Sequence, residues 1–290
     1  MGGPPNNVLD RTGPAQAMEP RRSARMLGGR GAGMMHVSDE LKTRYPALDA
    51  TSVEELLGRA AAAQVRVSRA DAVSPIAKIP LKVRDLLQIA LDRNIELTKG
   101  FVSVCNQELL VPAFVLGRAI VETGALAWDA YKRADRILAA RAKNDLPELD
   151  RHLVNVLLGA KSKEALTDPV QYPAPNVLTI IDRITKSDVG NLRGLYDLLC
   201  EFAHPNHAGM QAVYRDLDPV KWESRARERP FADAIHAVEV AFQAVAVGFE
   251  MSVAAVELYE DKLTALAGLC EEHIWEGGTW PPSLPYPVQR

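Results

Sequence analysis

Residues 231–272 read FADAIHAVEVAFQAVAVGFEMSVAAVELYEDKLTALAGLCEE. Mostly apolar side chains recur in this segment at alternating spacings of four and three residues, the pattern of a helix that packs along a seam. A second, alanine-rich row beside the seam indicates burial from two sides. We therefore expect one long central helix. The seam residues are Phe231, Ile235, Val238, Phe242, Val245, Phe249, Ser252, Val256, Tyr259, Leu263, Leu266 and Cys270.

Other parts of the chain also carry helical periodicity. A hydroxyl at Thr51 followed by a carboxylate at Glu54 indicates a capping box, and Ser187 or Asp188 is suited to cap a later helix. No segment alternates with period two between hairpin turns, so no sheet is expected. The prediction is an all-α bundle of about six to eight helices with one long C-terminal helix. The other expected helices cover residues 51–68, 80–104, 112–141, 147–160, 176–186 and 189–203.

The composition is that of a folded chain with a sizeable core, since 47% of 290 residues are hydrophobic. Met34 and Met35 directly precede the first structured-looking segment, and we treat them as an alternative translation start to Met1. Three segments are expected: a disordered basic tail over 1–36, a single helical domain over 37–275, and an extended proline-rich tail over 276–290.

The charge and cysteine pattern narrow the class of protein. A net charge of -3 gives no overall field that attracts nucleic acid or an anionic membrane, so such binding requires a local patch. The three cysteines form no CxxC pair, which favours a reducing compartment. No apolar run has signal-peptide character, and charged residues interrupt the most apolar stretches. We therefore expect a cytoplasmic protein without a membrane span. No phosphate loop, dinucleotide fingerprint or zinc-ligand spacing occurs, so no cofactor and no metal are expected.

The densest polar chemistry lies in residues 196–207, YDLLCEFAHPNH. On a helix, Asp197, Glu201 and His204 share one face, and Pro205 disfavours helical geometry at His204, so the histidine stands where the helix ends. A histidine oriented by a carboxylate is the usual general acid or base. A structural interpretation is also open, in which His204 and Asn206 only close the helix end.

This run, Tyr-x-x-Leu-Cys-Glu-x-x-His-Pro-Asn, follows a helix that carries Arg118-Ala-Ile-Val-Glu122. The two motifs together resemble uncharacterised bacterial helical-bundle proteins related to the HEPN superfamily, over roughly residues 80–270. The resemblance implies a HEPN-like bundle in which Arg118 and Glu122 lie near His204. It also implies RNA or a nucleotide as partner, with Arg118 holding phosphate and His204 moving a proton. The expected catalytic residues are His204, Glu201, Arg118 and Glu122, and the expected binding residues are Tyr196, Asp197, Asn206 and His207.

One feature departs from that family. HEPN ribonucleases use an arginine separated from the histidine by four to six residues, and the corresponding positions before His204 are Asp197, Leu198 and Leu199. The pair Arg229 and His236 does fit the spacing, but it stands at the start of the expected seam helix. Metal-independent ribonuclease activity is thus an expectation from the resemblance, without the usual spacing.

Two alternatives remain at this stage. In the first, the protein is a non-catalytic helical interaction protein, for which a homodimer through helical faces is one option. Arg118 and Glu122 are then an ordinary i,i+4 pair on a solvated strip that continues through Asp129, Arg133 and Arg136. In the second, the protein is a di-metal carboxylate bundle, because the Glu-x-x-His spacing presents two ligands from one helix. Its ligands would come from Glu201, His204, Asp233, His236, Glu122 and either Glu239 or Glu250.

Overall fold

A computed structural model describes residues 35–278, apart from 66, 68–72, 75, 160–171, 173 and 219, and without the side chains of Gln211 and Ala212. The expected basic tail up to residue 34 and the expected proline-rich tail from residue 279 lie outside the described residues. The described part of the chain is all-α, with one small hairpin, so the predicted fold class is confirmed.

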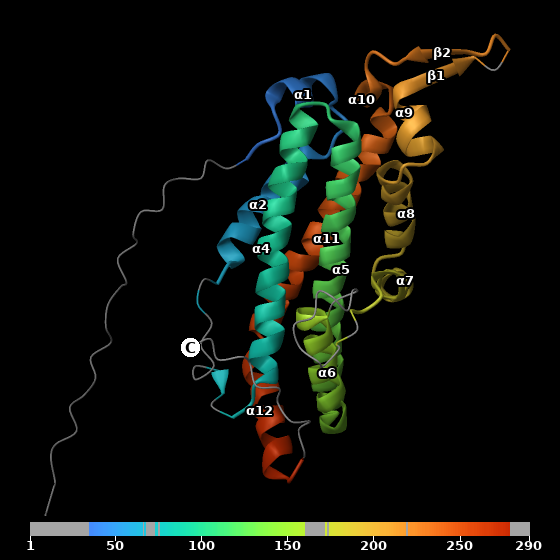
Figure 1. The fold of residues 1–290 in the computed structure, drawn as a ribbon. Helices are drawn as coiled ribbons and strands as arrows, with labels where there is room; N and C mark the ends of the chain where they lie inside the picture. Colours follow the sequence, from blue (N-terminus) through green and yellow to red (C-terminus); the bar gives the residue numbers. More distant parts are fainter. Residues whose placement is uncertain are drawn as a thin grey trace, which may run out of the picture. The chain divides into compact units, whose positions relative to one another are not determined.

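Three long helices form the centre of the bundle. They are α4 (Ile79–Asn106), α5 (Leu110–Ala140) and α11 (Ile235–Glu260), which run side by side and contact one another pairwise (Figure 1). The shorter helices pack around this trio. α2 (Ala50–Ala63) lies on α11, α6 (Leu146–Leu158) on α4 and α5, α7 (Val177–Ser187) on α5, α8 (Leu192–Ala203) on α5 and α11, and α12 (Leu263–Trp275) on α4.

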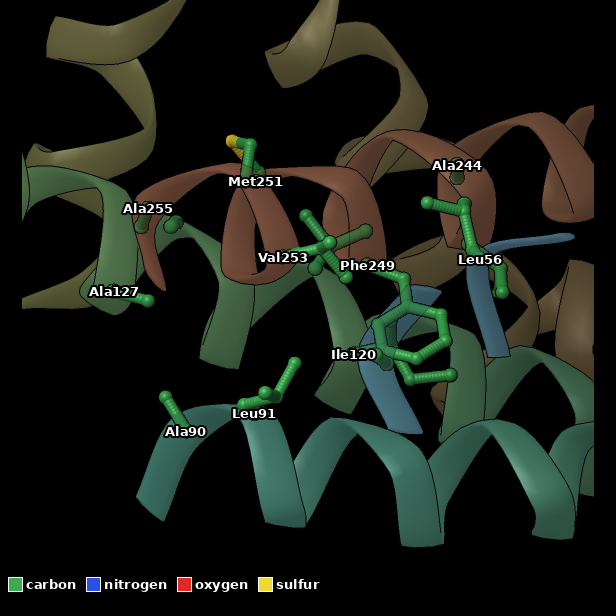
Figure 2. Packing of buried hydrophobic residues seen from close by; sticks show 14 of the residues in the cluster. Leu56, Ala90, Leu91, Ile120, Ala127, Ala244, Phe249, Met251, Val253 and Ala255 are labelled. Carbon is green, nitrogen blue, oxygen red and sulfur yellow. The ribbon is translucent and has the colours of Figure 1, made fainter. Parts of the chain in front are cut away.

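Aliphatic and aromatic side chains fill the space between the three central helices. Figure 2 shows Leu91 of α4, Ile120 of α5 and Phe249 of α11 pointing toward one another, with Leu56 of α2 close by. Ser252, the polar member of the predicted seam, is fully buried but accepts a hydrogen bond of 2.8 Å from Asn94 Nδ2 on α4. A buried hydroxyl that has such a partner avoids the cost of an unmet hydrogen bond.

Glycines set the distance between α5 and α11. A Cβ atom added to Gly124 would lie 1.9 Å from the Gly248 carbonyl oxygen, and one added to Gly248 would lie 2.8 Å from Val121 Cα. The two backbones therefore touch at a point that only glycine permits. This crossing fixes the position of the middle of α5, from which polar side chains project on either side.

The seam helix differs from the expectation in one respect. It is divided into α10 (Pro230–Asp233), α11 and α12, with breaks at Ala234 and at Asp261–Lys262. Lys262 turns there toward α5, where it pairs with Asp135 and lies 5.6 Å from the Tyr131 ring centroid. The prediction of a single helix over residues 231–272 was therefore wrong. The predicted seam residues do lie on the buried faces of α10, α11 and α12.

The two expected caps were also wrong. The N-cap of α2 is Asp49, whose side chain accepts from Ser52 N at 3.3 Å, while Glu54 accepts from Val37 N outside the helix. Asp188 ends α7, and α8 begins after Asn191 without a side-chain cap. A short helix, α1 (Asp39–Arg44), and a 3-10 turn (Lys143–Asp145) are also present, and the sequence did not indicate either of them.

An unexpected hairpin lies between α8 and α10. After the π-helical segment His207–Gln211 and the turn α9 (Ala212–Tyr214), β1 (Arg215–Asp218) pairs antiparallel with β2 (Glu223–Ala226). The expectation of no sheet was wrong for this segment. Both strands are exposed along almost their whole length, so they lack the apolar alternation by which a half-buried strand is predicted.

Two helices are long and apolar enough to cross a membrane by length and composition alone, α5 and α11. In each, 56% of the most apolar window is buried within the bundle. Core helices of water-soluble bundles meet the same two criteria, so these features are weak evidence for a span.

Candidate functional site

The end of α8 is shaped by the residues that follow it. His204 is the C-cap residue and has an extended backbone (φ -84°, ψ 149°), as expected before Pro205. Asn206 then donates to Glu201 Oε2 at 2.8 Å and accepts from Gly209 N at 2.9 Å. A Cβ atom at Gly209 would lie 2.0 Å from the His204 carbonyl oxygen, so the chain turns back closely on the helix end. The turn leaves the His204 side chain exposed.

Four side chains from α5 and α8 meet at this point. Arg118 Nε donates to Glu122 Oε1 at 2.9 Å, and Tyr196 OH donates to the same oxygen at 2.7 Å. Arg118 Nη1 lies 3.3 Å from His204 Nε2. Arg118 and His204 lie 86 positions apart in the sequence, yet the four side chains form one continuous series of contacts from Tyr196 to the imidazole.

Helix packing explains why α5 and α8 present these groups to each other. Leu199 of α8 lies against Gly117 of α5, where an added Cβ would be 3.2 Å from a leucine methyl. Phe114 of α5 stacks on Phe202 of α8 with ring centroids 4.4 Å apart. These apolar contacts align the last turn of α8 with the Arg118 turn of α5. Stacked aromatic pairs of this kind add about 1 kcal/mol beyond the area they bury.

The charges in the group are well defined. Burial lowers the pKa of Arg118, but the hydrogen bond to Glu122 and the electrostatic interactions with Cys200, Tyr196 and Glu122 together more than offset this, so its pKa is raised and the guanidinium stays charged. Burial and the nearby Glu122 carboxylate raise the pKa of the Tyr196 phenol, which therefore remains a neutral donor. Because a guanidinium can only donate, Nε2 of His204 is the acceptor in this arrangement, and the proton of the neutral ring is assigned to Nδ1.

Comparisons with protein-family models, with curated proteins and with solved structures give no match.

Chemically, the group combines a fixed cation with an accessible imidazole. Arg118 uses Nε and Nη1 within the protein, and its side chain remains about one-third exposed. The guanidinium has five N–H donors, so donors remain for an anion that approaches from solvent. An exposed imidazole beside such a cation is equipped to transfer a proton at a bound phosphate.

Some of the predicted residues lie outside this group. Glu201 is exposed and bonds to Asn206, so it stabilises the turn and does not orient His204. Asp197 points to Arg193, whose Nε donates to the two carboxylate oxygens at 2.8 and 2.9 Å. His207 lies at the start of the π-helical segment and is exposed.

One residue next to this group had no predicted role. Cys200 is half-buried one turn after Tyr196, and burial raises the pKa of its thiol, so it is not an activated nucleophile. In the sequence, only its place in the Tyr-x-x-Leu-Cys run marks Cys200. That run identifies the motif and gives no role for the cysteine.

The di-metal alternative requires carboxylates that the fold keeps apart. Glu250 binds Arg59 at 2.7 Å, Glu239 lies 3.1 Å from His236, and Glu122 is held by Arg118 and Tyr196. Within the described residues, no group of three or more His, Cys, Asp or Glu side chains could hold a metal ion.

The other pair with the ribonuclease spacing is Arg229 and His236. The His236 side chain is 94% exposed at the start of α11.

Proposed function

We propose that this chain is a cytoplasmic HEPN-like protein that binds RNA and cleaves it without a metal ion. The observation that carries the proposal is the 3.3 Å contact between Arg118 Nη1 and His204 Nε2. The arginine that HEPN ribonucleases carry a few residues before the histidine is missing here, and α5 supplies one from the neighbouring helix instead. The same two functional groups are therefore available at one exposed position.

The proposed reaction uses each group once. Phosphate binding to Arg118 draws the guanidinium away from His204 and frees Nε2, which then takes the proton of a ribose 2′-hydroxyl. The 2′-oxygen forms a bond to phosphorus, the bond from phosphorus to the 5′-oxygen breaks, and the leaving oxygen takes a proton from water. The hydroxide formed in this way takes the proton from His204, which returns the imidazole to its neutral state. The products are a 2′,3′-cyclic phosphate and a 5′-hydroxyl end.

Glu122 and Tyr196 are positioning residues in this scheme. Glu122 fixes the Nε edge of Arg118, so that the Nη edge faces His204 and solvent. Tyr196 is buried and donates to the same carboxylate oxygen, which limits the rotamers open to Glu122. Neither group needs to touch the substrate.

The test is cleavage of single-stranded RNA by the purified full chain, with a chelator present, for wild type, His204→Ala and Arg118→Gln. His236→Ala is the matched control, because it removes another exposed histidine from a different helix. We expect cleavage by wild type and His236→Ala, with cyclic phosphate ends, and at least a hundredfold loss in the other two variants. Thermal melts establish that all four proteins are folded.

Loss of cleavage in His236→Ala alone would move the activity to the Arg229 and His236 pair.

Absence of RNA cleavage by all four proteins would support a second function, that of a non-catalytic helical interaction protein. The observation in its favour is that Arg118, His204 and the stacked Phe114 and Phe202 also tie α5 to the end of α8. In that case no protein cleaves RNA and His204→Ala melts at a lower temperature than wild type. Light scattering would then show whether the protein is a dimer.

A further inference from the structure

A polar cavity lies on the other half of α5, in a region that the proposed function does not use. It has a volume of about 230 Å³ and is lined by Arg133 and Arg136 of α5, Arg183 of α7, and Asp145 and Glu148 at the start of α6. Arg133 follows Arg118 by 15 residues on the same helix, which places the two groups about 22 Å apart. This separation makes the cavity a distinct site.

A buried carboxylate organises two of the three arginines. Asp129 is 4% exposed and lies on α5 one turn before Arg133. It accepts from Arg133 Nε at 2.9 Å and lies 3.2 Å from Arg183 Nη1 and 3.2 Å from His152 Nε2. Burial alone would raise its pKa, but these three partners hold the pKa of Asp129 below its ordinary value of 3.8, so the anchor is ionised at neutral pH.

The anchor leaves the outer edges of both guanidiniums available. Arg133 uses Nε and Arg183 uses Nη1 for Asp129, which leaves further N–H donors on each. Arg136, one turn along α5, is exposed, and its side chain makes no hydrogen bond or ion pair with any other residue in the described part of the chain. Three guanidiniums that share a cavity and hold donors in reserve form a site suited to a phosphate group.

The other wall of the cavity carries the opposite charge. The side chains of Asp145 and Glu148 are exposed and, among the described residues, neither carboxylate has a hydrogen-bond or ion-pair partner. A simple anion would meet repulsion from these carboxylates, whereas a ligand with an ammonium group at its other end would meet attraction. We propose that this cavity binds a small phosphate monoester that also carries an ammonium group, with the phosphate on the three arginines and the ammonium on Asp145 and Glu148.

Calorimetry on the full chain tests the proposal with three related probes: glucosamine 6-phosphate, glucose 6-phosphate, which lacks the ammonium, and glucosamine, which lacks the phosphate. We expect wild type to bind the first most tightly and the third least. Arg136→Gln is the informative variant, because an exposed side chain without a partner can be changed without cost to the fold. It should lose at least tenfold in affinity for both phosphates.

Two further variants complete the design. The double change Asp145→Asn and Glu148→Gln should abolish the preference for glucosamine 6-phosphate over glucose 6-phosphate. Arg225→Gln, which alters an exposed arginine on the hairpin that is paired with Glu223, should bind as wild type does. Wild type that binds no phosphate probe at millimolar concentration, Arg136→Gln that binds as wild type does, or equal wild-type affinities for the two phosphates would each overturn the proposed ligand class.

Discussion

The two polar groups on α5 are built from the same parts but differ in what is buried. Around His204, the carboxylate of Glu122 is about one-third exposed and the histidine is exposed. Around Asp129, the carboxylate has only 5% of its side chain exposed, and His152 packs against it with 13% exposed. An accessible imidazole can exchange protons with a substrate. The buried imidazole of His152 instead packs against the carboxylate of Asp129 and helps to stabilise its negative charge. The first group is therefore suited to chemistry, and the second to binding through the arginines that it orients.

The glycine crossing between the two groups keeps them in place, and breaking it should have the largest effect. Gly124→Ala puts a Cβ atom 1.9 Å from a backbone carbonyl oxygen that cannot rotate away, so α5 and α11 must separate. We expect a loss of about 3 kcal/mol in the free energy of unfolding, measured by urea denaturation. Gly58→Ala in α2 is the control, since nothing lies within 4 Å of its added Cβ.

For that control we expect no loss and a gain of up to about 1 kcal/mol, from the higher helix propensity of alanine. If Gly124→Ala were as stable as Gly58→Ala, the close approach of the two helices would be wrong.

Burial also explains which parts of the molecule the sequence could predict. Long helices such as α4 and α5 were predicted to within two residues at each end, because their apolar stripes repeat over many turns. The hairpin was missed because its strands are short and exposed, and because Trp222 adopts a positive φ of 55° that its residue type does not indicate.

The polar groups divide in the same way. His204 was found because Pro205 marks a helix end locally. Arg118 was placed near it only by the family resemblance, since the contact depends on how α5 and α8 pack. Asp129 was assigned to a solvated strip with Arg133 and Arg136, and this was wrong, because α6 and α7 cover it with His152 and Arg183. Residues on three separate helices make these contacts, so no regular spacing in the sequence indicates them.

Neutralising the buried carboxylate should have the next largest effect. Asp129→Asn leaves Arg133, Arg183 and His152 around an uncharged amide, and we expect a loss of about 2 kcal/mol at pH 7. The folded-state pKa of Asp129 is lowered, so its contribution is present above pH 3.8 and is lost as the pH falls through the folded value. The difference between wild type and variant should therefore shrink in urea melts at pH 3.

Asp197→Asn is the matched control, because its carboxylate is paired with Arg193 but has 53% of its side chain exposed. Solvent screening limits such a pair to less than about 1 kcal/mol. An Asp129→Asn variant that is no less stable than Asp197→Asn would contradict the anchoring role. It would also contradict the inference that Asp129 orients Arg133 and Arg183 toward the cavity.

The smallest expected effect separates positioning from stability in the His204 group. Tyr196→Phe removes one hydrogen bond of 2.7 Å to Glu122 while Arg118 still binds the same carboxylate, so the loss in stability should be about 1 kcal/mol. Tyr214→Phe, which changes a half-exposed phenol beside the hairpin, should be neutral. If Glu122 positions Arg118 for a substrate, Tyr196→Phe should weaken RNA binding or cleavage more than its change in stability predicts, and Tyr214→Phe should not. An equal effect of the two changes would reduce Tyr196 to a packing residue and leave Arg118 to be oriented by Glu122 alone.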